Sequence, residues 1–184
     1  IRRESRFRRD TVLTRLDYAA SQERPELVKP ILTLRTICAE VEASYPSDLP
    51  RGVIHGDMFR DNVFWQGAEV SAVIDWESAS DGDLLYDLCV VFLAWCYGDD
   101  FRWREARALF AGYSSVRPLE PSEVAALRTL CLAGAARFST TRILDFHLRS
   151  GGVGERVMKD YRRFLARAST LAALTNDELA GKLL

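Results

Sequence analysis

The chain has 184 residues, of which 48% are hydrophobic and 28% charged, and its formal net charge is -1. This composition is typical of one globular unit, so we expect a single domain over residues 1–184. A balanced charge provides no electrostatic attraction for nucleic acid or for an anionic membrane, and we expect neither as a partner.

Apolar residues recur at helical spacing in the first part of the chain. Residues 8–20 and 26–44 are predicted helices, and Tyr45-Pro46-Ser47 ends the second one. No glycine occurs in residues 1–51, and the only lysine there, Lys29, directly precedes Pro30 inside the second helical pattern. A phosphate-covering loop needs glycine, because the backbone must approach the phosphates closely. We therefore expect residues 1–48 to be leading helices without such a loop.

Residues 49–82 combine short apolar runs with acidic and amide residues. Three runs are predicted strands: residues 52–54, 63–65 and 70–74. Asp57 follows the first run, Asn62 directly precedes the second, and Asp75 follows the third. Alternating strands and turns should bring these three polar residues to one rim.

These three residues suit phosphoryl transfer. Asp57 is the candidate catalytic base, because a carboxylate can orient an acceptor hydroxyl and accept its proton. Asn62 and Asp75 are the candidate ligands of Mg²⁺, which favours oxygen ligands and would bind them together with the phosphates of ATP. In the alternative interpretation, the Asp61-Asn62 pair only bonds its own backbone in a turn.

The remainder of the chain, residues 83–184, is predicted to be a helical subdomain. Its helices are expected at residues 83–97, 103–113, 121–148 and 155–174, with a flexible connector at Arg149–Gly154. The four cysteines have no Cys-x-x-Cys spacing, so we interpret them as reduced core thiols. Reduced thiols and the lack of an apolar signal core at the N-terminus favour a cytoplasmic location.

The segment from His55 to Asp87 carries a family resemblance. His55-Gly56-Asp57, Asn62, Asp75 and Asp87 resemble the catalytic and metal-binding segments of the aminoglycoside phosphotransferase and choline kinase superfamily, the small-molecule relatives of protein kinases. Within that superfamily, residues of about 45–165 are most similar to the C-terminal lobe of kinase-like homoserine kinases. That match includes residues 49–63, Trp95-Cys96, 113–119 and 136–147.

The resemblance implies an α+β, mostly helical fold: the C-terminal lobe of a protein-kinase-like enzyme, with short strands around the catalytic loop and without the N-terminal nucleotide lobe. It implies an ATP- and Mg²⁺-dependent kinase acting on a small hydroxyl compound, L-homoserine first. The missing lobe of the same enzyme is then an expected partner, and this chain alone is expected to be inactive. Leu93-Ala94 and Ser139 differ from the pattern of those kinases. A choline, ethanolamine or aminoglycoside acceptor therefore stays open, as does a non-catalytic binding or dimerisation module.

Five further residues complete the predicted site. Glu77, Arg137 and Arg142 are candidates for substrate binding, since a guanidinium group suits an acceptor carboxylate. Glu77 could equally face solvent. The two arginines lie about 140° apart on a helix, and pairing with acids such as Asp145 is the alternative. His55 and Asp87 are predicted to support the catalytic loop rather than to react, Asp87 by satisfying backbone donors.

Overall fold

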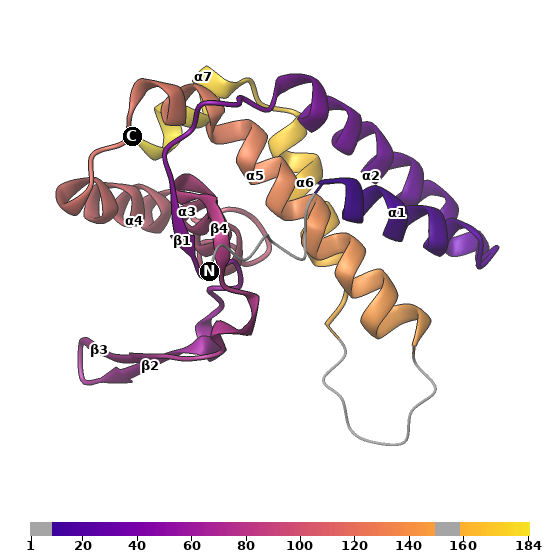
Figure 1. Cartoon of the computed structure of the whole chain (residues 1–184), viewed down its shortest axis with the longest axis horizontal. Helices are drawn as coiled ribbons and strands as arrows, with labels where there is room; N and C mark the ends of the chain where they lie inside the picture. Colours follow the sequence, from indigo (N-terminus) through magenta and orange to yellow (C-terminus); the bar gives the residue numbers. More distant parts are fainter. Residues whose placement is uncertain (1–8, 150–158) are drawn as a thin grey trace.

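The computed structural model of the protein describes residues 9–149 and 159–184. Its first two helices, α1 (Arg9–Ala20) and α2 (Pro25–Ser44), lie side by side and pack on the long central helix α5 (Pro121–Arg142) (Figure 1). Pro25 occupies the first turn of α2, where its missing N–H costs nothing. The buried residues of α2 recur every three or four positions: Leu27, Ile31, Leu34, Ile37 and Val41. Lys29 therefore lies on a helix, as predicted.

Four short strands form two separate antiparallel pairs. β1 (Arg51–Ile54) pairs with β4 (Ser80–Asp83), and β2 (Val63–Gln66) pairs with β3 (Glu69–Val73) in a hairpin. In Figure 1 this hairpin projects from the body of the molecule. β4 was not predicted, because Ser-Asp-Gly-Asp contains no residue type that favours strands. β4 is a strand because it pairs with β1. In that pairing Arg51 of β1 lies opposite Asp83 of β4 and binds its carboxylate at 3.0 Å.

The remaining regular elements of the described chain are helices. In chain order they are η1 (Arg60–Asn62), η2 (Trp76–Ser78), α3 (Leu84–Trp95), α4 (Trp103–Val116), α5, η3 (Ile143–Leu148), α6 (Arg162–Ala172) and α7 (Asn176–Leu183). The predicted helix over residues 121–148 is α5 followed by a π-helical segment, η3. The predicted helix 155–174 is described only from residue 159, and the predicted connector lies outside the described residues except for Arg149. α7 was missed, although Thr175 and Glu178 form a capping box.

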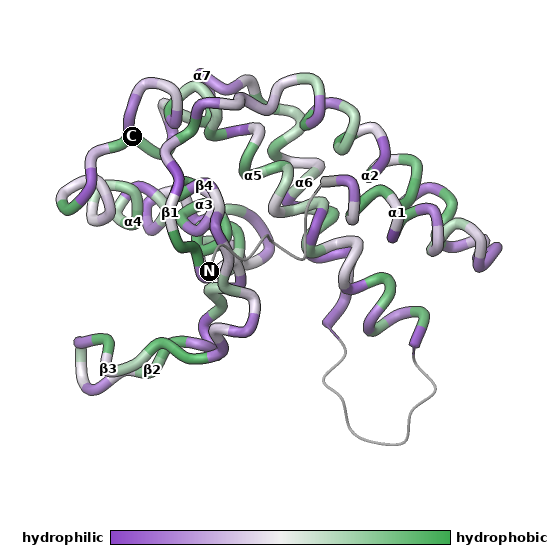
Figure 2. Tube along the Cα trace, in the orientation of Figure 1, coloured by the Kyte–Doolittle hydropathy of each residue, from purple (hydrophilic) through white to green (hydrophobic). Residues whose placement is uncertain are grey.

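One hydrophobic core joins these elements into a mostly helical α+β fold, as predicted. α5 contacts α1, α2, α3, α6 and α7, and buried residues occur all around it, which is typical of a central helix. Figure 2 shows α3 as a largely hydrophobic segment, and it packs against β1, β4 and α5. All four cysteines are free thiols, and burial raises the pKa of Cys38 and Cys96 to about 11. Within the described ranges, no helix has both the length and the apolar character to cross a membrane.

Candidate active site

The backbone after β1 is fixed by one carboxylate from α3. Asp87 accepts hydrogen bonds from the backbone N–H groups of His55 at 2.6 Å and of Gly56 at 2.7 Å. Gly56 has a φ of +75°, a conformation that costs an L side chain energy. Asp87 lies in the first turn of α3, which packs against β1, so helix and strand packing place the carboxylate under the loop. This is the supporting contact predicted for Asp87.

His55 connects the loop to the segment that carries Asp75. Its side chain is only 1% exposed. The ring Nδ1 accepts the N–H of Asp57 at 3.2 Å, and Nε2 lies 2.9 Å from the carbonyl oxygen of Ile74. The first contact requires an unprotonated Nδ1, so Nε2 carries the hydrogen and donates it to Ile74. Both ring nitrogens of His55 are therefore engaged in hydrogen bonds, one with the Asp57 backbone and one with the Ile74 carbonyl.

The β2–β3 hairpin brings Asn62 and Asp75 together. The hairpin turns at Gly67, which has a φ of +64°, and its open end pairs Val63 with Val73. The Ile74 N–H donates to the Asn62 carbonyl at 3.0 Å, which extends the ladder by one step. Asn62 and Asp75 therefore flank the open end of one hairpin. Because the hairpin is short, residues that flank its open end are also close in the sequence.

The side chains of Asn62 and Asp75 are suited to a cation. Asn62 is 9% exposed, and its amide nitrogen donates to the Asp57 carbonyl at 2.9 Å, so its oxygen is the atom that can bind a cation. Asp75 is exposed and has left-handed backbone angles (φ 64°, ψ 51°), which for a residue other than glycine are enriched at functional sites. The described part of the chain contains no group of three His, Cys, Asp or Glu able to hold a metal ion. Two protein ligands suit Mg²⁺, which takes its other ligands from phosphate and water.

Asp57 sits at the boundary between the core and solvent, with 31% of its side chain exposed. Burial raises the pKa of its carboxyl group, while the positive charges of Arg137 and Lys159 oppose the rise and the negative charge of Asp75 adds to it. The influence of Asp75 indicates that both carboxylates act on one small region. A half-buried carboxylate with cationic neighbours is equipped to accept a proton from a substrate hydroxyl.

Three aromatic and basic contacts anchor the loop beyond Asp57, and sequence reasoning did not find them. Trp95 donates its indole N–H to the Met58 carbonyl at 3.0 Å, and Arg60 donates to the Trp95 carbonyl at 2.6 Å. The Phe59 ring packs edge-on against Phe138 of α5, with centroids 4.8 Å apart. The contact of Trp95 has no sequence signal, because the position of an indole N–H depends on the packing of α3 against the loop.

Lys159 is a further cation at this site that sequence reasoning did not identify. Its Nζ lies 3.7 Å from the Asp61 carboxylate and 5.9 Å from the centroid of the Phe59 ring. It is separated from Asp61 by almost a hundred residues, so no local pattern could have indicated the pairing. Its place beside the Asp57 loop is decided by tertiary packing.

The candidate substrate residues occupy different environments. Arg137 is 4% exposed and donates to the Gly56 carbonyl, and its Nη2 lies 3.8 Å from the Asp57 carboxylate. Arg142 donates to the Asp160 carbonyl at 3.1 Å and stacks on the Phe164 ring at 4.4 Å. Burial lowers the pKa of Arg142 to about 10, and the charges of Asp57 and Asp61 oppose this. Glu77 is exposed on η2.

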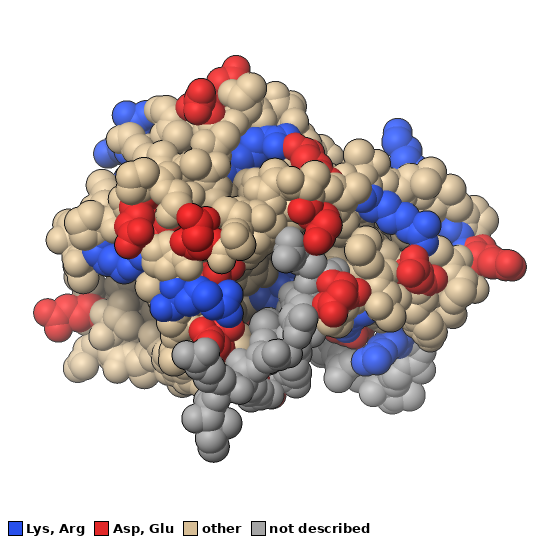
Figure 3. All heavy atoms as spheres, turned by 45° about the horizontal axis from the view of Figure 1, so that its top comes forward, with Lys and Arg blue, Asp and Glu red and all other residues tan. Residues whose placement is uncertain are grey.

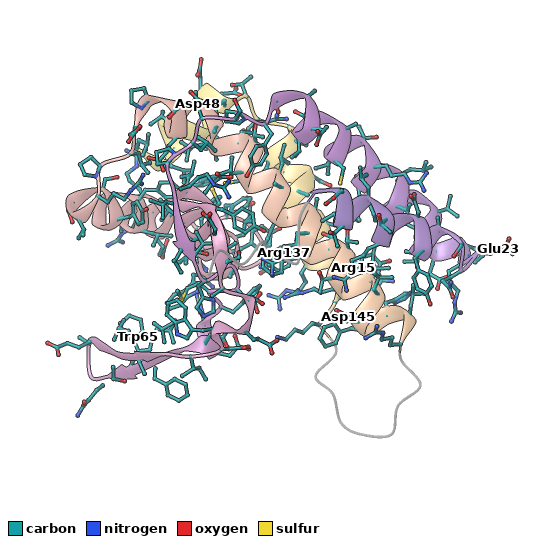
Figure 4. All side chains as sticks on the ribbon, viewed as in Figure 1. Arg15, Glu23, Asp48, Trp65, Arg137 and Asp145 are labelled. Carbon is teal, nitrogen blue, oxygen red and sulfur yellow. The ribbon has the colours of Figure 1, made fainter. Side chains whose placement is uncertain are left out.

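The expected pairing of the arginines with Asp145 needs correction. Asp145 pairs with Arg15 at 3.4 Å and with Arg149 at 3.5 Å, and the acid beside Arg137 is Asp57 instead (Figure 4). Although the two arginines are separated in angle on the helix, Arg142 is close enough to the site for the charges of Asp57 and Asp61 to oppose the fall of its pKa. A long arginine side chain reaches well beyond the position of its Cα atom, so spacing alone was a poor guide.

A cavity of about 580 Å³ lies beside this site, between α1, α2, α5 and the β1–β4 pair. Its wall includes Arg137, Tyr86 and Ile54, together with acids from three elements, among them Glu42 and Asp81. Figure 3 shows acidic and basic side chains interspersed over the visible face, without a patch of one sign. Arg137 lines the cavity and also contacts Asp57, whereas Asp57 itself is not part of the cavity wall.

Comparison with known proteins gives one family for this arrangement. Residues 2–119 match the model of the family described as "Phosphotransferase enzyme family". A homoserine kinase of Methylobacterium nodulans is 44% identical over 133 residues, which are 70% of this chain and 41% of that protein. Homoserine kinases of Methylobacterium radiotolerans and Gluconobacter oxydans are 46% and 47% identical, over 70% and 61% of this chain and 41% and 37% of their own length.

A solved structure matches the fold. The crystal structure of a choline/ethanolamine kinase family protein from Mesorhizobium loti superposes with a TM-score of 0.53 at 18% identity, covering 94% of this chain and 58% of the other. This likeness concerns the fold only. The chain spans about two fifths of the length of the curated relatives it matches.

Proposed function

The chain belongs to the phosphotransferase enzyme family, and on that premise we propose that it carries the acceptor-side catalytic centre of a kinase that transfers the terminal phosphoryl group of ATP to the hydroxyl of L-homoserine. The observation that supports this most directly is the hairpin that brings Asn62 and Asp75 together, joined to the Asp57 loop by His55. A binding module without chemistry would not need all three residues in this arrangement.

In the proposed mechanism Asp57 orients the acceptor hydroxyl. As the bond between the acceptor oxygen and the terminal phosphorus forms, the bond from that phosphorus to the bridging oxygen of ADP breaks, and the hydroxyl proton passes to the Asp57 carboxylate. Asn62 and Asp75 would hold Mg²⁺, which when bound neutralises the charge that develops on the phosphate oxygens. His55, Asp87 and Asn62 keep the loop in place, because each bonds its backbone.

The acceptor is proposed from the relatives and from the charges around Asp57. The three curated relatives described above carry the name homoserine kinase. A free amino acid acceptor presents a carboxylate, and two cations lie near this site: Lys159, whose Nζ is 3.7 Å from the Asp61 carboxylate, and Arg142, on which the charges of Asp57 and Asp61 act. Arg142 keeps its charge at neutral pH, since its pKa of about 10 is well above 7. Glu77 or Asp57 would face the ammonium group of the same acceptor.

The nucleotide-clamping residues are proposed to belong to the part of the relatives' length that this chain does not cover. A kinase-like enzyme clamps the phosphates with a second lobe. The experiment must therefore use the full-length protein that contains this chain. Phosphate transfer from ATP would be measured for L-homoserine, choline and kanamycin side by side, with and without Mg²⁺. Homoserine should be preferred, and a preference for choline or kanamycin would overturn the acceptor.

Two variants test the assigned roles against a matched control. Asp57→Asn should lower kcat by about 10²- to 10⁴-fold with little change in nucleotide affinity, because it removes the proton acceptor. Asp75→Asn should in addition weaken the Mg²⁺-dependent binding of ATP, measured by calorimetry. Asp99→Asn makes the same chemical change at an exposed position away from the loop and should leave both quantities unchanged. Wild-type turnover in both site variants would refute the assignment.

A further inference from the structure

The guanidinium group of Arg137 is built into the wall behind the catalytic loop. Arg137 lies on α5, its residue is 4% exposed, and Figure 4 places it between α5 and the β1–β4 pair. Its Nη1 donates to the Gly56 carbonyl and to the Tyr86 hydroxyl, the latter at 3.3 Å. Its Nη2 is 3.8 Å from the carboxylate of Asp57, the residue that follows Gly56. One side chain thus contacts both the backbone and the reacting side chain of the loop.

The peptide groups around Gly56 are held from opposite sides. Asp87 of α3 accepts the N–H groups of His55 and Gly56, while Arg137 of α5 donates to the Gly56 carbonyl. The Asp57 N–H is held by the His55 ring. The backbone from the His55 nitrogen to the Asp57 nitrogen therefore has a fixed orientation between the Asp87 carboxylate and the Arg137 guanidinium group. Such contacts determine where the Asp57 carboxylate points.

A direct contact between Arg137 and the acceptor does not fit this geometry. The Arg137 side chain is 5% exposed, whereas 31% of the Asp57 side chain is accessible. An acceptor that reaches the open side of Asp57 meets the carboxylate first, with Arg137 behind it. Arg142 is only partly buried, so it is the arginine better placed for a substrate carboxylate.

We propose that Arg137 is the positioning residue of the catalytic loop: it fixes the Gly56 peptide and the Asp57 carboxylate for attack and does not bind the acceptor. This inference rests on the proposed function, because it assigns Arg137 a part in that reaction. Arginine suits the role better than lysine, since its planar fork can serve the carbonyl and the carboxylate at once. A displacement of about 1 Å in a reacting group can cost roughly 100-fold in rate.

The test uses Arg137→Gln and Arg137→Lys in the full-length protein. Arg137→Gln removes the charge and the fork, and should lower kcat roughly 100-fold while KM for L-homoserine stays within about twofold. Arg137→Lys keeps the charge but serves one partner at a time, and should recover part of that loss, to roughly 10-fold below wild type. A rise in KM with kcat unchanged would show an acceptor contact and overturn the proposal.

Arg128→Lys is the matched control on the same helix. Arg128 is partly buried, and like Arg137 it donates to backbone carbonyls and pairs with an acid, in this case with Leu171, Ala172 and Glu40 and not with the Asp57 loop. It should lower stability without changing kcat, so equal kcat losses in the Arg128 and Arg137 variants would overturn the proposal. Amide hydrogen exchange of the Gly56 and Asp57 segment should speed up only in the Arg137 variants, and unchanged exchange would also contradict it. If Asp57→Asn keeps full turnover, the proposed function fails instead.

Discussion

The carboxylate of Asp87 makes the sharpest stability prediction, because its two oxygens each accept one backbone N–H of the catalytic loop, at 2.6 and 2.7 Å. Asp87→Asn replaces one oxygen with an NH₂ group that faces a donor. A hydrogen bond to a charged group contributes about 1.5–3 kcal/mol, and a neutral one about 0.5–1.5 kcal/mol. Losing one bond and weakening the other should therefore lower the free energy of unfolding by about 3 kcal/mol.

Urea and thermal denaturation, followed by circular dichroism, measure this change. For a chain of this size each kcal/mol shifts Tm by about 2–4 °C, so a decrease of roughly 6–12 °C is expected. Asp99→Asn is the control, because Asp99 is exposed and the same substitution there should change stability by less than about 0.5 kcal/mol. The reasoning is refuted if the Asp87 and Asp99 variants unfold together.

Two glycine substitutions should change the stability of the protein in opposite directions. The raised pKa of Asp57 should make that stability depend on pH. Gly56→Ala should destabilise by about 1–2 kcal/mol, since Gly56 has a φ of +75° and its Cβ would lie 3.4 Å from the Ser78 carbonyl oxygen. Gly112→Ala lies inside α4 with open space around the new Cβ and should stabilise by about 0.5–1 kcal/mol, so urea midpoints that shift in the same direction would contradict the argument. The pKa of Asp57 is raised by burial, so the folded state favours its neutral form, and the stability that this provides at low pH is lost as the pH rises through the folded pKa. Asp57→Asn mimics the neutral form, so its stability relative to wild type should increase from about pH 3 to about pH 7; a difference that is constant or falls with pH would count against a raised pKa.

The catalytic loop shows how far local sequence patterns reach. Asn62 and Asp75 could be placed together because β2 and β3 form a hairpin between neighbours in sequence, and Asp57 precedes that hairpin by one short loop. Glycine at 67 and the apolar runs on either side specify that hairpin with no help from distant residues. The helices α1 to α4 were predictable for the same reason, since their apolar periodicity is a local property.

The strand pairing of β1 was decided by tertiary structure. Its partner β4 has the sequence Ser-Asp-Gly-Asp, which no propensity favours as a strand. A Cβ at Gly82 would lie 2.3 Å from the Ile54 side chain, so Ile54 fills the space that glycine leaves and would have to move if a larger residue stood there. This contact becomes visible only when both strands are in place.

The sequence alone indicated that Asp57, Asn62 and Asp75 lie close together and in this order, because the loop and hairpin that carry them are short and local. Only the tertiary structure decided which cations surround Asp57. Arg137 comes from α5, 80 residues after Asp57, and Lys159 reaches the loop about a hundred residues after Asp57. The direction of a long basic side chain is determined by the packing of every element around it, and that packing has no counterpart in residue spacing.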